Sequence, residues 1–153
     1  MICNTSMHRL LNNRPAISTP MMTGYRICRR QTETGAPYWT LTDATPPDAI
    51  LPSADLTALE WDCNEVMLDM DDSIPVLLNA GLLLLIRWKE QMEREFPNVP
   101  FDIVLSVDEG EEGVPPSVTL RFYGVREGVH YVVPTEESLE KFAQPILLET
   151  VNP

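Results

Sequence analysis

The chain has 153 residues, a length typical of one domain. Its composition is 44% hydrophobic, which supplies enough apolar side chain for a buried core and argues against global disorder. Eleven Lys and Arg stand against 23 Asp and Glu, so the formal net charge is −12. Such an acidic chain repels phosphate backbones and anionic lipid headgroups, so we expect no direct nucleic-acid binding and no membrane binding.

The first 20 residues are rich in Asn, Pro, Ser and Thr and lack hydrophobic periodicity, which predicts a loose N-terminal arm. Met21 and Met22 come just before the first regularly patterned segment, so a natural start there would place the arm outside the native product. The arm has no continuous apolar stretch of the kind that a secretory signal needs. Residues 21–153 are then expected to form a single cytoplasmic domain.

Residues 25–41 predict a β-hairpin, because apolar and polar residues alternate on both sides of a turn that contains Gly35. A connection with three prolines follows over 43–53.

Residues 56–70 fit two patterns. Their apolar residues share a helical face that Ser53 would cap, but residues 61–70 also alternate as a strand with a bulge at Asn64 and Glu65. We favour the strand, because the polar residues 71–73 then begin the following helix.

A long helix is expected over about 74–96. Ser73 or Asp72 is a suitable N-cap, Pro75 is tolerated in the first turn, and Pro97 ends the helix. The first half is apolar on nearly all sides and the second half is amphipathic, so this helix should form the centre of the core.

Strands and a second helix are expected after the long helix. Residues 101–107, 118–123 and 129–133 alternate and are separated by glycine-containing turns, which predicts a meander over 101–133. Thr135 would cap a short C-terminal helix, and 146–151 is a candidate last strand. The predicted fold class is α+β, with an antiparallel sheet of about five to six strands packed on one long helix.

The sequence lacks the usual signatures of catalysis and of cofactor binding. It has no glycine-rich phosphate loop and no nucleophile elbow, and its three cysteines are scattered, as in a protein with reduced thiols. His130 would need a converging acid and a nucleophile such as Cys63, so a solvent-facing strand residue or a satisfied hydrogen bond is the simpler interpretation. We therefore expect no enzyme, no cofactor and no metal site.

Charge is distributed unevenly along the chain. Residues 1–43 carry five arginines and two acids, whereas residues 44–153 carry six basic and 21 acidic residues. Two acidic clusters and two nearby tyrosines form the predicted partner-binding set, because tyrosines beside acids suit a protein–protein contact with a charged rim. The set is Asp69, Asp71, Asp72, Asp108, Glu109, Glu111, Glu112, Tyr123 and Tyr131. The competing interpretation of 108–112 is a solvated hairpin turn.

The leading functional hypothesis is a small acidic binding protein that neutralises a basic protein partner, as bacterial immunity proteins do with their toxins. A phage-encoded inhibitor of a nucleic-acid enzyme, of the anti-CRISPR or anti-restriction type, ranks second. A nucleic-acid mimic should carry its acids in regular rows, whereas the acids of this sequence are patchy. A small-molecule-binding domain or an enzyme with a pocket between helix and sheet is the remaining alternative. Electrostatic repulsion between copies of such an acidic chain favours a monomer.

Overall fold

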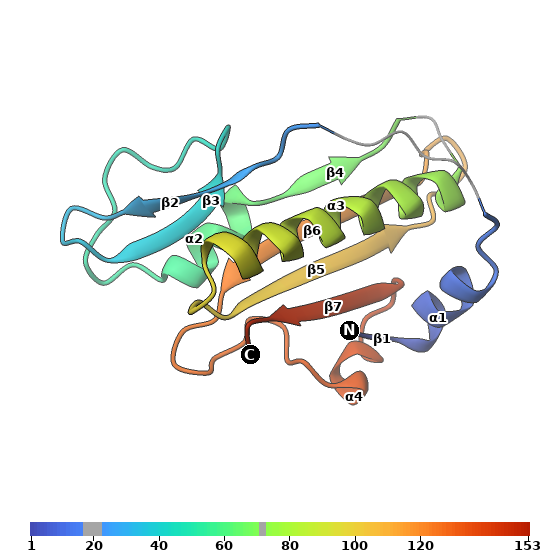
Figure 1. The fold of residues 1–153 in the computed structure, drawn as a ribbon. Helices are drawn as coiled ribbons and strands as arrows, with labels where there is room; N and C mark the ends of the chain where they lie inside the picture. Colours follow the sequence, from blue (N-terminus) through green and yellow to red (C-terminus); the bar gives the residue numbers. More distant parts are fainter. Residues whose placement is uncertain (17–22, 71–72) are drawn as a thin grey trace.

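The computed structural model describes residues 1–16, 23–70 and 73–153 and has the α+β architecture that the sequence predicts (Figure 1). An antiparallel sheet has the strand order β1-β7-β5-β6-β4, and β2 and β3 form a separate hairpin. The strands are β1 Ile2–Cys3, β2 Ile27–Gln31, β3 Pro37–Leu41, β4 Val66–Leu68, β5 Phe101–Asp108, β6 Ser117–Gly124 and β7 Ile146–Val151. The helices are α1 Thr5–Asn12, α2 Leu56–Cys63, α3 Ile74–Glu95 and α4 Glu136–Leu139.

Helix α3 covers one face of the sheet and forms the main core with it (Figure 1). Trp88 is 1% exposed and packs edge-on against Phe122, with ring centroids 5.0 Å apart, so it is a core residue. At Gly81 a Cβ atom would lie 2.9 Å from the Val118 side chain and 3.1 Å from that of Leu105. A glycine is needed here because the helix lies very close to β5 and β6. No helix within the described residues is long and apolar enough to cross a membrane.

The opposite face of the sheet carries a second, smaller core cluster. Its buried members include Val104, Leu148, Val132 and Leu139, so α4 and the chain that follows β6 cover part of this face. The remainder of this face is open and forms a groove.

The first residues of the chain are packed into the domain, which corrects the predicted loose arm at its start. β1 pairs with β7, and Asn4 caps α1 by accepting a hydrogen bond from the backbone N–H of Met7 at 3.0 Å. Met7 is fully buried, and Asn4 also accepts a bond from the backbone N–H of Ile146. Local sequence patterns do not predict this packing, because the residues that this short segment contacts lie about 140 positions away in the sequence.

Residues 56–70 divide into a helix and a strand, so the preference for strand was wrong for the first half. Asp55, rather than Ser53, caps α2 by accepting bonds from the N–H groups of Thr57 and Ala58. β4 then begins at Val66 and pairs with β6.

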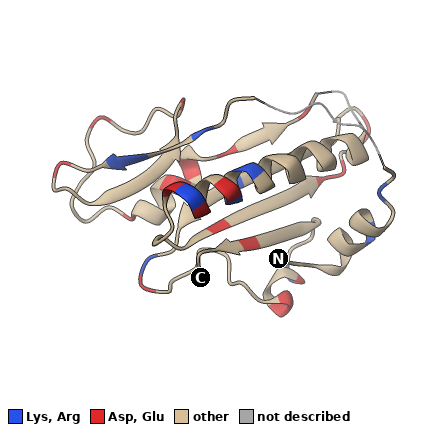
Figure 2. Cartoon of the chain, in the orientation of Figure 1, with Lys and Arg blue, Asp and Glu red and all other residues tan. Residues whose placement is uncertain are grey.

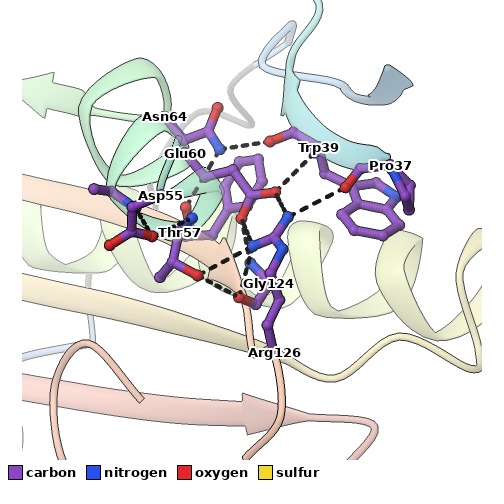
Figure 3. Close-up of polar contacts among 10 residues, drawn as sticks. Pro37, Trp39, Asp55, Thr57, Glu60, Asn64, Gly124 and Arg126 are labelled. Atoms are coloured by element: carbon purple, nitrogen blue, oxygen red, sulfur yellow. Dashed lines mark hydrogen bonds and ion pairs between the residues drawn. The ribbon is translucent and has the colours of Figure 1, made fainter. Parts of the chain in front are cut away.

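Helix α2 lies between β3 and β6 and joins their edges through the side chain of Glu60 (Figure 3). Glu60 is fully buried and accepts a bond from the Trp39 N–H at 3.0 Å and another from the Gly124 N–H at 2.6 Å. Arg126 completes the arrangement with bonds of 2.6 and 3.0 Å to the two carboxylate oxygens. One carboxylate thus accepts hydrogen bonds from backbone N–H groups of both β3 and β6 and from the Arg126 guanidinium.

Asn64, one helical turn after Glu60, also bonds to the backbone of both strands. Its Oδ1 accepts a bond from the Leu41 N–H at 3.0 Å, while its Nδ2 donates to the carbonyls of Trp39 and Phe122. Residues four apart share one face of a helix, so Glu60 and Asn64 lie in line between the strands and occupy the place of a missing strand. The hairpin is in this way attached to the larger sheet, which requires α2 to be a helix.

Residues 129–133 are not a strand, so the predicted meander ends after β6. Glu127 and Gly128 have positive φ angles of 53° and 70° and form a tight turn that an isolated bridge between Arg126 and Val129 closes. Val132 is buried against the covered part of the sheet face opposite α3, while β7 takes the place beside β5. The alternation of Val129, Tyr131 and Val133 therefore reflects exposure to solvent and not strand pairing.

Helix α3 holds the other edge of the hairpin. Gln91 accepts a bond from the Ile27 N–H at 3.1 Å and donates one to the Ile27 carbonyl at 2.8 Å, as a neighbouring strand would. Glu95 continues this link by accepting bonds from Gln91 at 2.9 Å and from Arg26 at 2.9 Å.

Acid should weaken this link. Hydrogen bonds from Gln91 and Arg94 lower the pKa of Glu95 from its ordinary value of 4.5. A lowered carboxyl pKa contributes stability that is complete above the ordinary value and is lost as the pH falls through the folded-state value. We expect Glu95→Gln to remove part of the acid-induced loss of stability below about pH 4.5, as measured by urea unfolding down to about pH 3. Glu93→Gln, an exposed position on the same helix, should retain the wild-type pH dependence.

Candidate functional site: an acidic groove on the open sheet face

The open part of the sheet face is a groove whose floor is one row of residues running across four strands. The register pairs Ile146 with Ser106, Ser106 with Thr119, and Thr119 with Met67. Two adjoining cavities of about 250 and 470 Å³ share Ser106, Thr119, Met67 and Gln144 in their linings. We call the two together the sheet groove. Its floor is low in the middle because Ser106 and Thr119 have small side chains.

One end of the sheet groove is acidic. Asp108 pairs with Ser117, two residues along the strands from the Ser106–Thr119 pair, or about 7 Å. Asp108, Glu109 and Glu111 line this end. The turn that carries them is built on Gly110, which has a φ of 77° and donates its N–H to Asp108 at 2.9 Å. A Cβ at Gly110 would lie 2.5 Å from the Val114 carbonyl oxygen, so only glycine fits this turn.

The other end of the sheet groove is aromatic. Trp61 and Phe142 line it together with Arg121, which places its guanidinium 4.7 Å from the centre of the Trp61 ring. Arg121 also forms an ion pair with Glu65. Tyr131 is 51% exposed and packs on the far side of this group, with its ring centroid 5.0 Å from that of Trp61.

The lining of the sheet groove is strongly negative. Among the residues that the structure describes, four carboxylates line it and Arg121 is the single basic residue of the lining. Because Arg121 already pairs with Glu65, the three acids at the far end have no basic neighbour within the lining. Exposed Met67 and Phe142 lie beside these charges, so the groove combines an apolar contact surface with a carboxylate rim.

Most of the predicted partner-binding residues that the structure describes lie at or near this groove. Asp69 follows β4 directly, and the register Leu68–Val118–Val107 places it at the same end of the sheet as Asp108. Glu112 is exposed next to Glu111 but does not line the groove. Asp71 and Asp72 lie outside the described residues.

Tyr123 corrects one part of the prediction, because it is fully buried and has no surface to offer a partner. Its hydroxyl donates to Asp102 at 2.9 Å and accepts a bond from the Val132 N–H at 3.0 Å. Burial raises the pKa of Tyr123, so the phenol stays neutral and can donate this bond. Tyr123 therefore fixes the segment that carries Tyr131 to the sheet.

Removing this hydroxyl should loosen that segment. Tyr123→Phe leaves one oxygen of the buried Asp102 and the Val132 N–H without this partner, so we expect a loss of about 1–3 kcal/mol in the free energy of unfolding. Urea unfolding of the two proteins measures the difference. Tyr25→Phe, at a 37% exposed tyrosine, should cost far less, and an equal cost for both would contradict the role given to Tyr123.

His130 makes a hydrogen bond, in agreement with the simpler interpretation of this residue. Its Nδ1 lies 2.5 Å from Asp102, which is fully buried and also accepts a bond from the Thr150 hydroxyl at 2.8 Å. Among the described residues, no hydrogen bond joins His130 to a serine or cysteine. The thiol of Cys63 has a pKa raised by burial and by the neighbouring Asp62, which disfavours the thiolate needed for nucleophilic attack.

The described part of the chain contains no cluster of three His, Cys, Asp or Glu residues arranged to hold a metal ion. Comparison with protein families, with curated proteins and with solved structures found no match to this chain.

Several groove residues were not among those predicted from the sequence. Alternation predicts that Ser106 and Thr119 lie on the side of their strands away from the main core, but it does not predict that the two residues pair with each other. Trp61 is only partly buried and lines the groove. Phe142 carried no sequence signal, because only the tertiary fold brings the end of α4 next to β5 and β6.

Proposed function

We propose that this chain is a small acidic binding protein that neutralises a basic protein partner by direct contact across the sheet groove. The observation that carries the proposal is the transverse row of Ile146, Ser106, Thr119 and Met67 with three carboxylates at one end. An immunity protein that inhibits a cognate bacterial toxin is the form of this function that we favour.

The shape of the groove supports a protein partner. Its floor is shallow and crosses four strands, which suits the broad contact of a protein surface better than the enclosed pocket of a small ligand. Met67 and Phe142 line the groove and are 53 and 39% exposed, and Tyr131, which is 51% exposed, packs against Trp61 at its aromatic end. Methionine and aromatic residues are enriched in protein interfaces.

The charge of the groove supports a basic partner. Three carboxylates without a basic neighbour in the lining would meet Lys or Arg side chains of the partner at the rim, and the net charge of −12 would steer the approach from longer range. A solvated turn would also explain acids at 108–112, but it would not explain why they lie beside exposed Met67 at the end of an open groove.

The proposal is tested by capturing the partner with three forms of the chain as bait. The first is wild type, the second carries Asp108→Lys, Glu109→Lys and Glu111→Lys, and the third carries Glu33→Lys, Asp43→Lys and Asp48→Lys. The last two have the same net charge, and all six positions are exposed. An extract of the organism that encodes the chain is applied at low salt and at high salt.

We expect one basic protein to bind the wild type and the third bait at low salt, and to be lost from the second bait and at high salt. Capture by all three baits alike, or by none, would contradict the proposal. The activity of the purified partner then separates a toxin from a nucleic-acid enzyme, which is the alternative form of the function.

A further inference from the structure

A second cavity lies on the α3 side of the sheet, where the chain enters β2. It is open, measures about 380 Å³, and is formed by the residues before β2 and by the second half of α3. Figure 2 shows basic and acidic positions side by side on this half of the helix. The lining consists of Gly24, Tyr25, Arg26, Arg87, Trp88, Glu90, Gln91 and Arg94.

Three of the 11 basic residues of this acidic chain gather around this one cavity. Arg26 and Arg94 both bind the same carboxylate, that of Glu95, at 2.9 and 3.0 Å. A guanidinium has five N–H donors, and the side chains of Arg26 and Arg94 are 67 and 68% exposed, so donors remain for a ligand. Glu90 lines the cavity and Glu95 pairs with both Arg26 and Arg94, so the cavity offers an anion the remaining exposed N–H donors of these two arginines and not an excess of positive charge.

The backbone beside these arginines is held in an unusual conformation. Gly24 and Tyr25 have positive φ angles of 92° and 57°, and tyrosine rarely adopts such an angle. The Trp88 indole N–H donates to the Tyr25 carbonyl at 2.8 Å, and Arg87 donates to the Gly24 carbonyl at 3.4 Å. Strained backbone fixed by its surroundings is often found at ligand sites, and here it orients Arg26 toward α3.

We propose that this cavity binds a small polyvalent oxyanion, a phosphate or a polycarboxylate, through the exposed guanidinium groups of Arg26 and Arg94. Planar guanidinium groups form paired hydrogen bonds with both kinds of anion. The long-range field of a chain with a net charge of −12 opposes anions, so binding has to come from direct contact in this cavity. The site shares no lining residue with the sheet groove and does not depend on the function proposed for it.

The test is a calorimetric titration of the full chain at low ionic strength, with pyrophosphate in one arm and citrate in the other. Trp88 lines the cavity, so its fluorescence provides a second readout of the same site. The variants are Arg26→Gln and Arg94→Gln, and the control is Arg29→Gln, an exposed arginine of β2 that is not in the lining. Thermal melting checks that each variant is folded.

We expect saturable binding in at least one arm, about tenfold weaker in Arg26→Gln and in Arg94→Gln because each loses a charge-assisted hydrogen bond. The control should bind like the wild type. A response in one arm identifies the class of anion. Absence of saturable binding in both arms, or equal weakening by Arg29→Gln, would overturn the inference.

Discussion

Replacing Glu60 with alanine is expected to lower the free energy of unfolding by about 3–5 kcal/mol, the range typical of a buried ion pair that loses one partner. The carboxylate is fully buried and bonds to the N–H groups of Trp39 and Gly124 and to Arg126. Its removal leaves a partly buried guanidinium without its counterion and two strand-edge donors without acceptors. The hairpin should then detach from the larger sheet before the rest of the domain unfolds.

Chemical unfolding and amide hydrogen exchange measure this effect. The Trp39 and Gly124 amides should exchange faster in Glu60→Ala, whereas those of β5 and β7 should remain protected. Glu65→Ala is the matched control, because it breaks a surface ion pair with Arg121 and should cost about 1 kcal/mol or less. A cost for Glu60→Ala no larger than for this control would show that Glu60 does not hold the two strand edges together.

Reversing the three acids at the end of the sheet groove is expected to slow association with the basic partner by roughly 10–100-fold at low salt. The variant carries Asp108→Lys, Glu109→Lys and Glu111→Lys. These acids lie at the rim, where charge mainly governs the rate of encounter, so the dissociation rate should change much less. The salt dependence of the association rate should also become weaker.

The matched control carries Glu33→Lys, Asp43→Lys and Asp48→Lys, which changes the net charge by the same amount at exposed positions outside the groove. Stopped-flow association at several salt concentrations compares the two variants. Only the groove variant should show the large decrease. An equal decrease in both would mean that net charge alone steers the partner and that the groove has no special role.

The layers of the fold could be predicted from the sequence because they depend on local patterns. Periodicity and the flanking prolines placed α3 within one residue of its observed end, and alternation placed β5 and its core-facing side. What could not be predicted depends on distant partners. The pairing of β1 with β7 joins segments at opposite ends of the chain, and a two-residue strand has no pattern of its own.

The helical state of α2 illustrates the same limit. Glu60 and Asn64 look like ordinary surface residues in the sequence, and only their position between β3 and β6 shows why they are buried. The candidate site also depends on contacts between distant parts of the chain. The acids at 108–111 were visible as a charged turn, whereas the floor formed by Ser106, Thr119 and Met67 depends on strand register, which one sequence does not specify.

Oxidation of Met67 in the purified complex tests whether the partner covers the sheet groove. Met67 is 53% exposed on the floor of the sheet groove, and Met1, which is 67% exposed and lies outside the groove lining, serves as an internal reference. Both are treated with dilute hydrogen peroxide, with and without the partner, and followed by mass spectrometry. We predict that the partner slows oxidation of Met67 sharply and leaves Met1 unchanged. Equal oxidation of Met67 in the free and bound chain would show that the partner does not cover the sheet groove.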